Sequence, residues 1–165
     1  MKTLHGAWQS VRHDELRDEL IHDPYQSARK FAEPTRCPEC GLVYREGRWT
    51  RGAVVPDAHE ARCPACARIH DDFPAGYVTL TGDFFRGHRD EILRLVRHCE
   101  AKEQAEHPLQ RIMQVAEEDD GVLVTTTDMH LARGIAHAVH AAYSGDLGFH
   151  YNREQCLLRA DWHRA

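Results

Sequence analysis

Two cysteine pairs constrain this chain more than any other feature of its sequence. They read Cys37-Pro-Glu-Cys40 and Cys63-Pro-Ala-Cys66, and residues 41–62 separate them. Two thiolates two residues apart can hold one side of a tetrahedral metal ion, and a second such pair closes the other side. Because sulfur fills all four positions, none is open for water, so the spacing predicts a structural site. We expect Zn²⁺ bound by Cys37, Cys40, Cys63 and Cys66.

Iron is the alternative metal. Gly41 follows the first pair, as in the paired knuckles of rubredoxin-like iron proteins, whereas Ala67 follows the second pair. Four thiolates do not by themselves distinguish zinc from iron, so an iron-bound redox module stays an alternative. Six cysteines in the chain favour metal binding in a reducing cytoplasm over a secreted disulfide framework. Cys99 and Cys156 fit small buried residues of a core better than ligands.

The composition changes along the chain and predicts three parts. Residues 1–36 have mixed charges and read as an N-terminal arm. Residues 37–72 hold the cysteine pairs and little aliphatic material, so this segment needs a metal to fold; we expect a zinc ribbon, with a hairpin between the two knuckles. Residues 75–165 carry the apolar patterns of an ordinary core and are expected to form a sandwich domain.

In that last part, alternating and helical patterns follow each other in a recognisable order. They predict helices at 83–104 and 128–143 and strands at 77–82, 111–118, 121–127, 145–152 and 155–162. The succession is β-α-β-β-α-β with an extra C-terminal strand. It matches the ferredoxin-like sandwich, in which two helices cover one face of an antiparallel sheet. The expected class is therefore α+β.

Arginines and aromatic residues gather around the cysteine pairs, although the chain has a formal net charge of -5. This balance argues against coating nucleic acid through bulk charge, so any such contact must be local. Arginine pairs with phosphate, and aromatic rings stack on unpaired bases. The candidate partner-binding residues here are Tyr44, Arg45, Arg48, Trp49, Arg51, Arg62 and Arg68. The alternative for Trp49 is that its ring covers the metal site while the arginines are merely solvated.

A second candidate surface lies on the helix expected at 128–143. His130, Arg133, His137 and His140 are spaced three, four and three residues apart, so they share the face opposite the core. An ordinary solvated face explains this stripe as well as an RNA-facing or protein-facing one does. It is a poor metal site, because no further ligand stands at a matching position.

Neither an enzyme nor a membrane protein is indicated by the remaining sequence. The GxSxG, HExxH and GxxxxGK[ST] motifs are absent, and no small-molecule substrate is evident. The chain has no run of 18 apolar residues and no signal-peptide pattern at its start. We therefore expect a non-enzymatic, cytoplasmic protein without a membrane partner.

Three stretches together resemble a known family. They are HDPYQSARKFAEPTRCPECGLVYREGRWTRG at 22–52, CPAC at 63–66, and VLVTTTDMHLARGIAHAVHAAYSGDLGFHYNREQCLLRADW at 122–162. They are similar to a bacterial group of small zinc-ribbon proteins. That group itself resembles the N-terminal part of the nonsense-mediated-decay-three family, whose eukaryotic members bind the large ribosomal subunit and carry it out of the nucleus. The larger relatives have more cysteines and further domains, so the resemblance implies subunit docking and not export.

The leading functional prediction is thus a zinc-binding factor that docks on the large ribosomal subunit or its rRNA, in assembly, stress or dormancy. The alternative from a different class is a zinc-dependent protein–protein adaptor without RNA. The two differ in salt dependence, since RNA docking weakens as salt rises.

Overall fold

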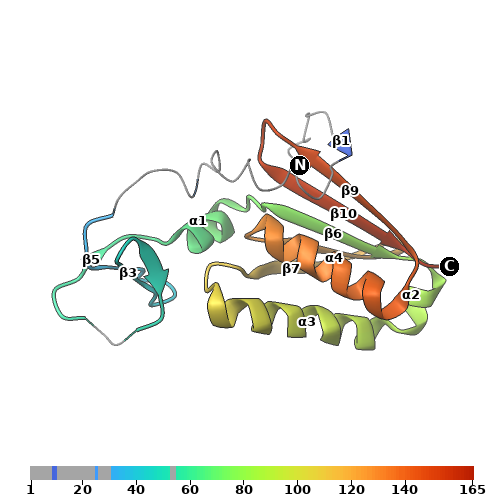
Figure 1. Cartoon of the computed structure of the whole chain (residues 1–165), viewed down its shortest axis with the longest axis horizontal. Coiled ribbons are helices and arrows are strands. Elements are labelled where there is room, and N and C mark those ends of the chain that lie inside the picture. The colour runs from blue at the N-terminus through green and yellow to red at the C-terminus, as the bar shows by residue number, and fades with distance from the viewer. Residues whose placement is uncertain (1–8, 11–24, 26–30, 53–54) are drawn as a thin grey trace.

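A computed structural model of the chain describes residues 9–10, 25, 31–52 and 55–165. Figure 1 shows two units, each built around its own sheet. The small unit (residues 31–71) lies at one end of the molecule, and the large unit (residues 76–163) forms the remainder. Within the described part of the chain, no helix is long and apolar enough to span a membrane.

The small unit consists of a four-stranded sheet and one helix. Its strands are short and lie in the order β4-β3-β2-β5. The elements are β2 (Thr35–Arg36), β3 (Val43–Arg45), β4 (Arg48–Thr50), β5 (His59–Glu60) and α1 (Pro64–Asp71). Since β2 pairs with both β3 and β5, the last two residues of the predicted N-terminal arm belong to this sheet. The rest of that arm falls almost entirely outside the described residues.

The large unit follows the predicted succession of elements. They are β6 (Gly76–Thr81), α2 (Asp83–Gly87), α3 (Arg89–Glu106), β7 (Ile112–Glu118), β8 (Gly121–Thr126), α4 (Met129–Tyr143), β9 (Asp146–Asn152) and β10 (Leu157–His163). The helix expected at 83–104 is two helices, because the backbone of His88 departs from helical angles (φ -124°, ψ 20°). The class α+β is confirmed, while the ferredoxin-like topology stays a prediction.

The sheet of the large unit is mixed, so the expected antiparallel sheet was wrong. Its strands lie in the order β1-β9-β10-β6-β8-β7, where β1 is Gln9–Ser10, and β10 runs parallel to β6. Leu157 and Leu158 point to opposite faces of β10 and are both fully buried. A strand that is apolar on both faces belongs inside a sheet. The second strand of the β9–β10 hairpin therefore lies next to β6, and the half-exposed β9 lies outside it.

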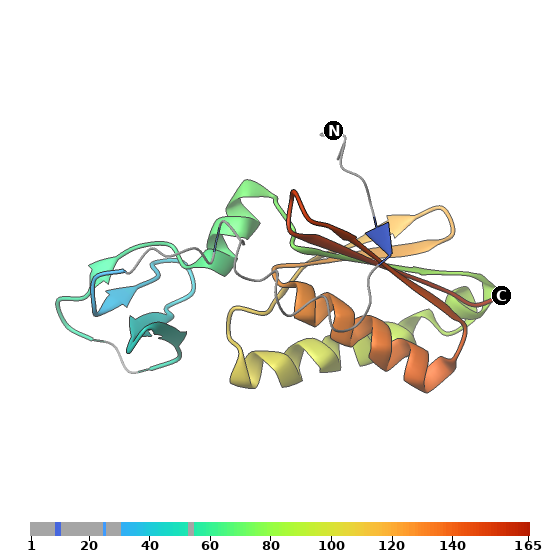
Figure 2. The ribbon, with the colours of Figure 1, turned by 45° about the horizontal axis from the view of Figure 1, so that its top comes forward.

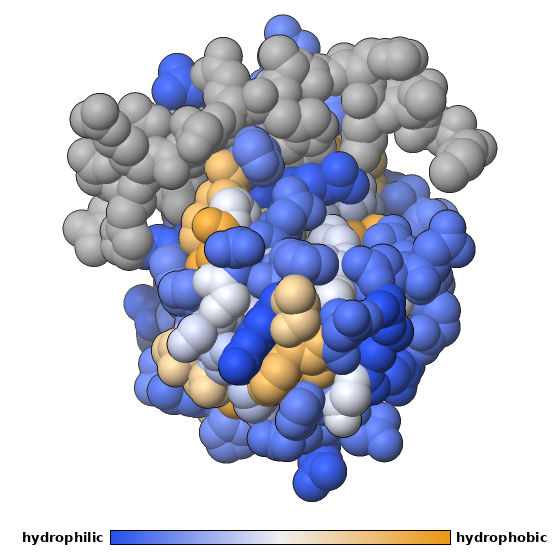
Figure 3. Space-filling model, turned by 90° about the vertical axis from the view of Figure 1, so that its right-hand side faces the viewer, coloured by the Kyte–Doolittle hydropathy of each residue, from blue (hydrophilic) through white to orange (hydrophobic). Residues whose placement is uncertain are grey.

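Both long helices cover one face of this sheet (Figures 1 and 2). The core between the layers is aliphatic and aromatic, with Leu80, Ile92, Ile135 and Trp162 all fully buried. The end of the large unit that faces away from the small unit is mostly hydrophilic, with hydrophobic residues only in small separate patches (Figure 3). The large unit therefore has a conventional core that does not involve the four paired cysteines.

Candidate metal centre

The first cysteine pair lies in the turn between β2 and β3. The N–H of Cys37 donates to the carbonyl of Leu42 at 2.8 Å, and the N–H of Gly41 donates to the carbonyl of Cys37 at 2.9 Å. Gly41 has φ 78°, a left-handed conformation that glycine adopts without a Cβ clash. This turn brings Cys37 and Cys40 to the same end of the small sheet.

The second pair lies at the start of helix α1, not in a knuckle of a ribbon, so the expected ribbon takes a different form. Cys63 is the N-cap residue, and its Sγ accepts from the N–H of Cys66 at 3.4 Å. Pro64 occupies the first helical position, where its missing N–H costs nothing and its fixed φ suits the helix. The helix thus holds Cys63 and Cys66 in a fixed relation while leaving both sulfurs on one side.

The four sulfurs converge on one point. Their Sγ atoms all lie within 4.8 Å of one another, and the Sγ atoms of Cys40 and Cys63 are 3.7 Å apart. Sulfurs in a regular tetrahedron around zinc, each at ~2.3 Å, are about 3.8 Å apart. All six cysteines of the chain are free thiols. The donor set and its spacing therefore fit a tetrahedral metal ion, and the predicted four ligands come together in space.

Burial disfavours bare thiolates at this site. Burial raises the pKa of the Cys63 thiol well above its ordinary value, and it raises that of Cys66 to about 11. For Cys37 burial acts in the same direction, but backbone hydrogen bonds, the largest from Cys63, outweigh it and lower the pKa to about 7. A bound divalent cation reverses this balance, because a coordinating thiol is deprotonated. A cation at the four sulfurs would therefore hold Cys63 and Cys66 as thiolates.

A side chain of the large unit reaches the sulfurs. The guanidinium of Arg111 donates to Cys66 Sγ through Nη1 and to Cys40 Sγ through Nη2, both at 3.3 Å, and its Nη2 lies 3.8 Å from Cys63 Sγ. Burial acts to lower the pKa of Arg111, but the hydrogen bonds to the sulfurs outweigh it and raise that pKa above its ordinary value. The sequence suggested only that Arg111 begins a strand, and no motif marked it as part of this site.

The aromatic residues of the small unit pack beside the sulfurs. Trp49 is 7% exposed, and its ring lies 5.1 Å from that of Phe31 and 5.5 Å from that of Tyr44, measured between centroids. This placement favours the alternative considered for Trp49, a packing residue of the metal unit, over base stacking. Tyr44 is half-buried and keeps part of its ring at the surface.

Three exposed arginines of the small unit, called the arginine edge below, lie on or directly after the β3–β4 hairpin. Arg45 and Arg48 face each other across the β3–β4 hairpin, and Arg51 follows β4. None of the three has an ion-pair partner within the residues that the structure describes. One carboxylate lies near them, since Glu33 Oε1 accepts from the N–H of Gly47 in the β3–β4 turn at 2.9 Å. Exposed arginines without a direct ion pair are available to an anionic partner.

Two other predicted arginines are engaged within the chain. The Nε of Arg62 donates to Glu39 Oε1 at 2.7 Å. Arg68 is 1% exposed; its Nη1 donates to the carbonyl of Phe73 at 2.9 Å, and its guanidinium lies 4.4 Å from the ring centroid of Tyr25. The surface role predicted for Arg68 is thus wrong, because α1 turns this side chain inward.

The histidine stripe lies on α4, away from the sulfurs. His137 and His140 are exposed, while His130 and Arg133 are half-buried. The ring of His137 lies 5.0 Å from that of Phe149, measured between centroids. The stripe is thus only partly exposed, and its role as a partner surface stays a prediction.

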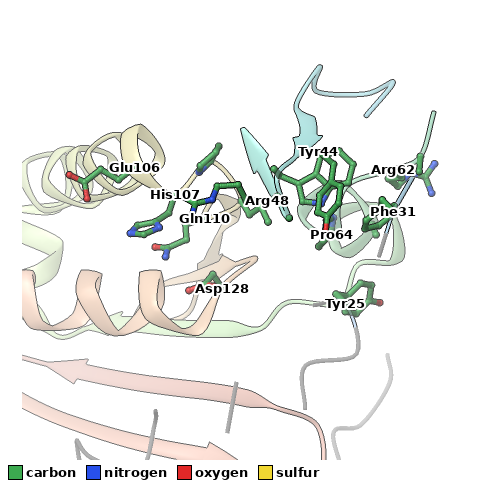
Figure 4. A pocket seen from close by; sticks show the side chains of 16 residues that line it. Tyr25, Phe31, Tyr44, Arg48, Arg62, Pro64, Glu106, His107, Gln110 and Asp128 are labelled. Carbon is green, nitrogen blue, oxygen red and sulfur yellow. The ribbon is translucent and has the colours of Figure 1, made fainter. Parts of the chain in front are cut away.

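A cleft of about 930 Å³ separates the aromatic side of the small unit from the large unit (Figure 4). Tyr44 and Arg48 line it from the small unit, and His107 and Gln110 line it from the large unit. A volume of this size is in the range of ligand sites, which is about 300–1,000 Å³. Because Arg48 also belongs to the exposed arginine edge, the cleft and that edge are continuous. No signal in the sequence predicted the cleft, since it forms only where the two units meet.

Comparison of the chain with protein-family models, with curated proteins and with solved structures finds no match in any of the three. What the site does is therefore inferred from the residues themselves.

Proposed function

We propose that the small unit is a structural zinc module whose task is to present the arginine edge of Arg45, Arg48 and Arg51 to RNA. The observation that carries this proposal is the exposure of three arginines without described ion-pair partners on a chain of net charge -5. A metal-built hairpin fixes these side chains in place, so a few charges can bind phosphates without a basic surface overall.

The partner is a structured ribonucleoprotein, and the resemblance to the nonsense-mediated-decay-three family points to the large ribosomal subunit. The cleft beside Arg48 supports this assignment, because it offers the half-buried ring of Tyr44 to a group that leaves the RNA surface. Binding in this mode needs no catalytic residue.

Zinc is the proposed ion, because four cysteine sulfurs at tetrahedral spacing form a closed structural site. Elemental analysis of the purified, reduced chain tests the metal: we expect one zinc per chain. A red protein that contains iron would favour the rubredoxin-like alternative over zinc. A protein with no bound metal would contradict the proposal.

Sedimentation tests the RNA-binding part. The zinc-loaded chain is mixed with purified large ribosomal subunits and run through sucrose gradients from low to high salt. We expect co-sedimentation at low salt that is lost as salt rises, and a triple variant Arg45→Gln, Arg48→Gln, Arg51→Gln that stays at the top. The matched control changes Arg94, Arg97 and Lys102 to Gln on α3, which alters the net charge equally at a different surface.

Two results would contradict the proposal. One is a zinc-loaded wild-type chain that stays at the top of the gradient at low salt. The other is a triple variant that sediments as the wild type does. Binding that is indifferent to salt and to the three substitutions would instead favour the protein adaptor, whose contact would be the aromatic cleft.

A further inference from the structure

We propose that Arg111 ties the large unit to the metal centre and thereby helps to fix how the two units are placed relative to each other. This inference rests on metal occupancy of the four sulfurs and does not require RNA binding. Its starting point is that the guanidinium lies on the sulfurs although Arg111 belongs to the other unit.

The backbone of Arg111 is fixed firmly within the large unit. Its N–H donates to Thr127 Oγ1 at 2.9 Å, and its carbonyl accepts from the N–H of Thr127 at 2.9 Å. The next residue, Ile112, donates its N–H to Glu100 on α3. The Nε of Arg111 donates to the carbonyl of Pro108 at 3.1 Å, which directs the side chain away from its own sheet. Arg111 is therefore a rigid projection of the large unit.

The far end of the side chain meets concentrated negative charge. A divalent ion bound by four thiolates carries a net charge of about -2. A planar guanidinium can donate to several sulfurs at once, here from Nη1 to Cys66 and from Nη2 to Cys40. Charge-assisted hydrogen bonds of this kind are roughly twice as strong as neutral ones, and partners of the ligands commonly tune a metal site.

Two other described links join the units. The linker at 72–75 is hydrogen-bonded to α1, where Phe73 N–H donates to the carbonyl of Arg68, and to β8, where Ala75 N–H donates to the carbonyl of Thr126. Leu109, two residues before Arg111, packs against the buried cluster of the small unit that contains Leu42 and Trp49. Leu109 supplies apolar contact, and Arg111 supplies the directed bonds to the sulfurs. Losing the guanidinium should therefore leave both units folded but free the angle between them and open the cleft of Figure 4.

Variants of Arg111 in the full zinc-loaded chain test this role. Arg111→Met keeps much of the side-chain length without charge, Arg111→Lys keeps charge without the planar fork, and Arg94→Met on α3 is the control. Thiol-reactive spin labels are unsuitable, because they would also modify the cysteines of the metal site. The arrangement of the units is therefore measured by small-angle scattering and by crosslinking. The crosslinker joins the amine of Lys102 in the large unit to the carboxylate of Glu60 in the small unit. Zinc release to a chromogenic chelator is followed in parallel.

We expect Arg111→Met to retain one zinc per chain, to broaden the scattering-derived size distribution, and to release zinc about 10–100-fold faster. Arg111→Lys should lie between it and the wild type, and Arg94→Met should behave as the wild type. A zinc-loaded Arg111→Met chain with unchanged scattering and crosslinking would overturn the inference. A wild-type chain that holds no metal would instead defeat the proposed zinc site itself, so the two failures are distinguishable.

Discussion

The two units of this molecule solve the problem of stability in different ways. The large unit buries aliphatic and aromatic side chains from seven elements, such as Leu80, Ile135 and Trp162, between a sheet and two long helices. The small unit buries Leu42, Trp49 and Ala65 together with Cys37, Cys63 and Cys66, so half of the residues in its buried cluster are cysteines. A segment with so little apolar material does not fold by burial alone. The comparison teaches that a metal ion at the four sulfurs would take the place of a hydrophobic core in the small unit, whereas the core of the large unit contains none of these sulfurs.

The strongest way to break this comparison is Cys63→Ser, which removes both a buried ligand and the cap of α1. Structural zinc contributes about 10–16 kcal/mol of binding free energy in small metal-dependent folds, so we expect zinc loss and unfolding of the small unit. The large unit should stay folded. Amide hydrogen exchange by NMR checks this: protection should vanish at residues 31–71 and persist at 76–163.

Cys99→Ser is the matched control, because Cys99 is a half-buried thiol on α3 outside the metal site. It should keep its zinc and its protection in both units. Loss of protection throughout the chain in Cys63→Ser would show that the large unit also depends on the metal.

The reciprocal change is Trp162→Ala in the large unit. Trp162 is fully buried, and its Nε1 donates to the carbonyl of Ser144 at 2.6 Å. Truncating a buried tryptophan to alanine costs about 3–5 kcal/mol. Urea unfolding followed by circular dichroism should show this loss, while the zinc content of the folded protein stays at the wild-type level. Zinc loss without a change in the urea midpoint would contradict the assignment of Trp162 to the large unit's own core.

A smaller loss of stability is expected from removing a helix cap, and the caps of the two units differ in kind. In α1 the cap is Cys63, one of the four candidate ligands, whereas in α4 it is Asp128, whose Oδ1 accepts from the N–H of His130 at 2.7 Å. Asp128→Ala should therefore cost only about 1 kcal/mol of unfolding free energy and no zinc. Asp128→Asn keeps an acceptor and should recover most of that loss. Equal stability of the alanine and asparagine variants in urea would argue against a capping role.

The smallest expected effect on stability belongs to the arginine edge. Arg45→Gln and Arg48→Gln change exposed side chains without described ion pairs, so the unfolding free energy should stay within about 0.5 kcal/mol of the wild type. The same urea experiment measures it. A larger loss would mean that these arginines hold the hairpin together, and their proposed role toward RNA would then need another explanation.

Local signals predicted much of this molecule. The spacing of the four cysteines predicted that their sulfurs come together, because two residues between cysteines allow both sulfurs to face the same ion. Alternation and helical periodicity located the strands and helices of the large unit to within a few residues.

What escaped prediction depends on contacts between distant residues. Arg111 lies 45 residues from Cys66, and an arginine at the start of a strand carries no local sign that it contacts sulfur. Helix α1 was missed because the spacing of Cys63 and Cys66 favoured a ribbon knuckle, although Pro64 after Cys63 is a common helix start. The burial of the Arg68 side chain and the position of β10 between β9 and β6 were also not predicted, because both depend on how distant parts of the chain pack. For β10 a signal existed: the adjacent Leu157 and Leu158 place apolar side chains on both faces of the strand.

The central position of β10 has a consequence for how the chain reaches this structure. Strand β6 has β10 as its neighbour on one side, and Thr81 of β6 donates to the carbonyl of Trp162, 81 residues away. During synthesis, β6 must wait for the whole intervening segment to emerge before that side is covered. Until then it is an open edge with apolar side chains, which invites pairing with other chains. Nascent chains of the large unit should therefore acquire protease resistance late and in a single step, since such distant pairing slows folding.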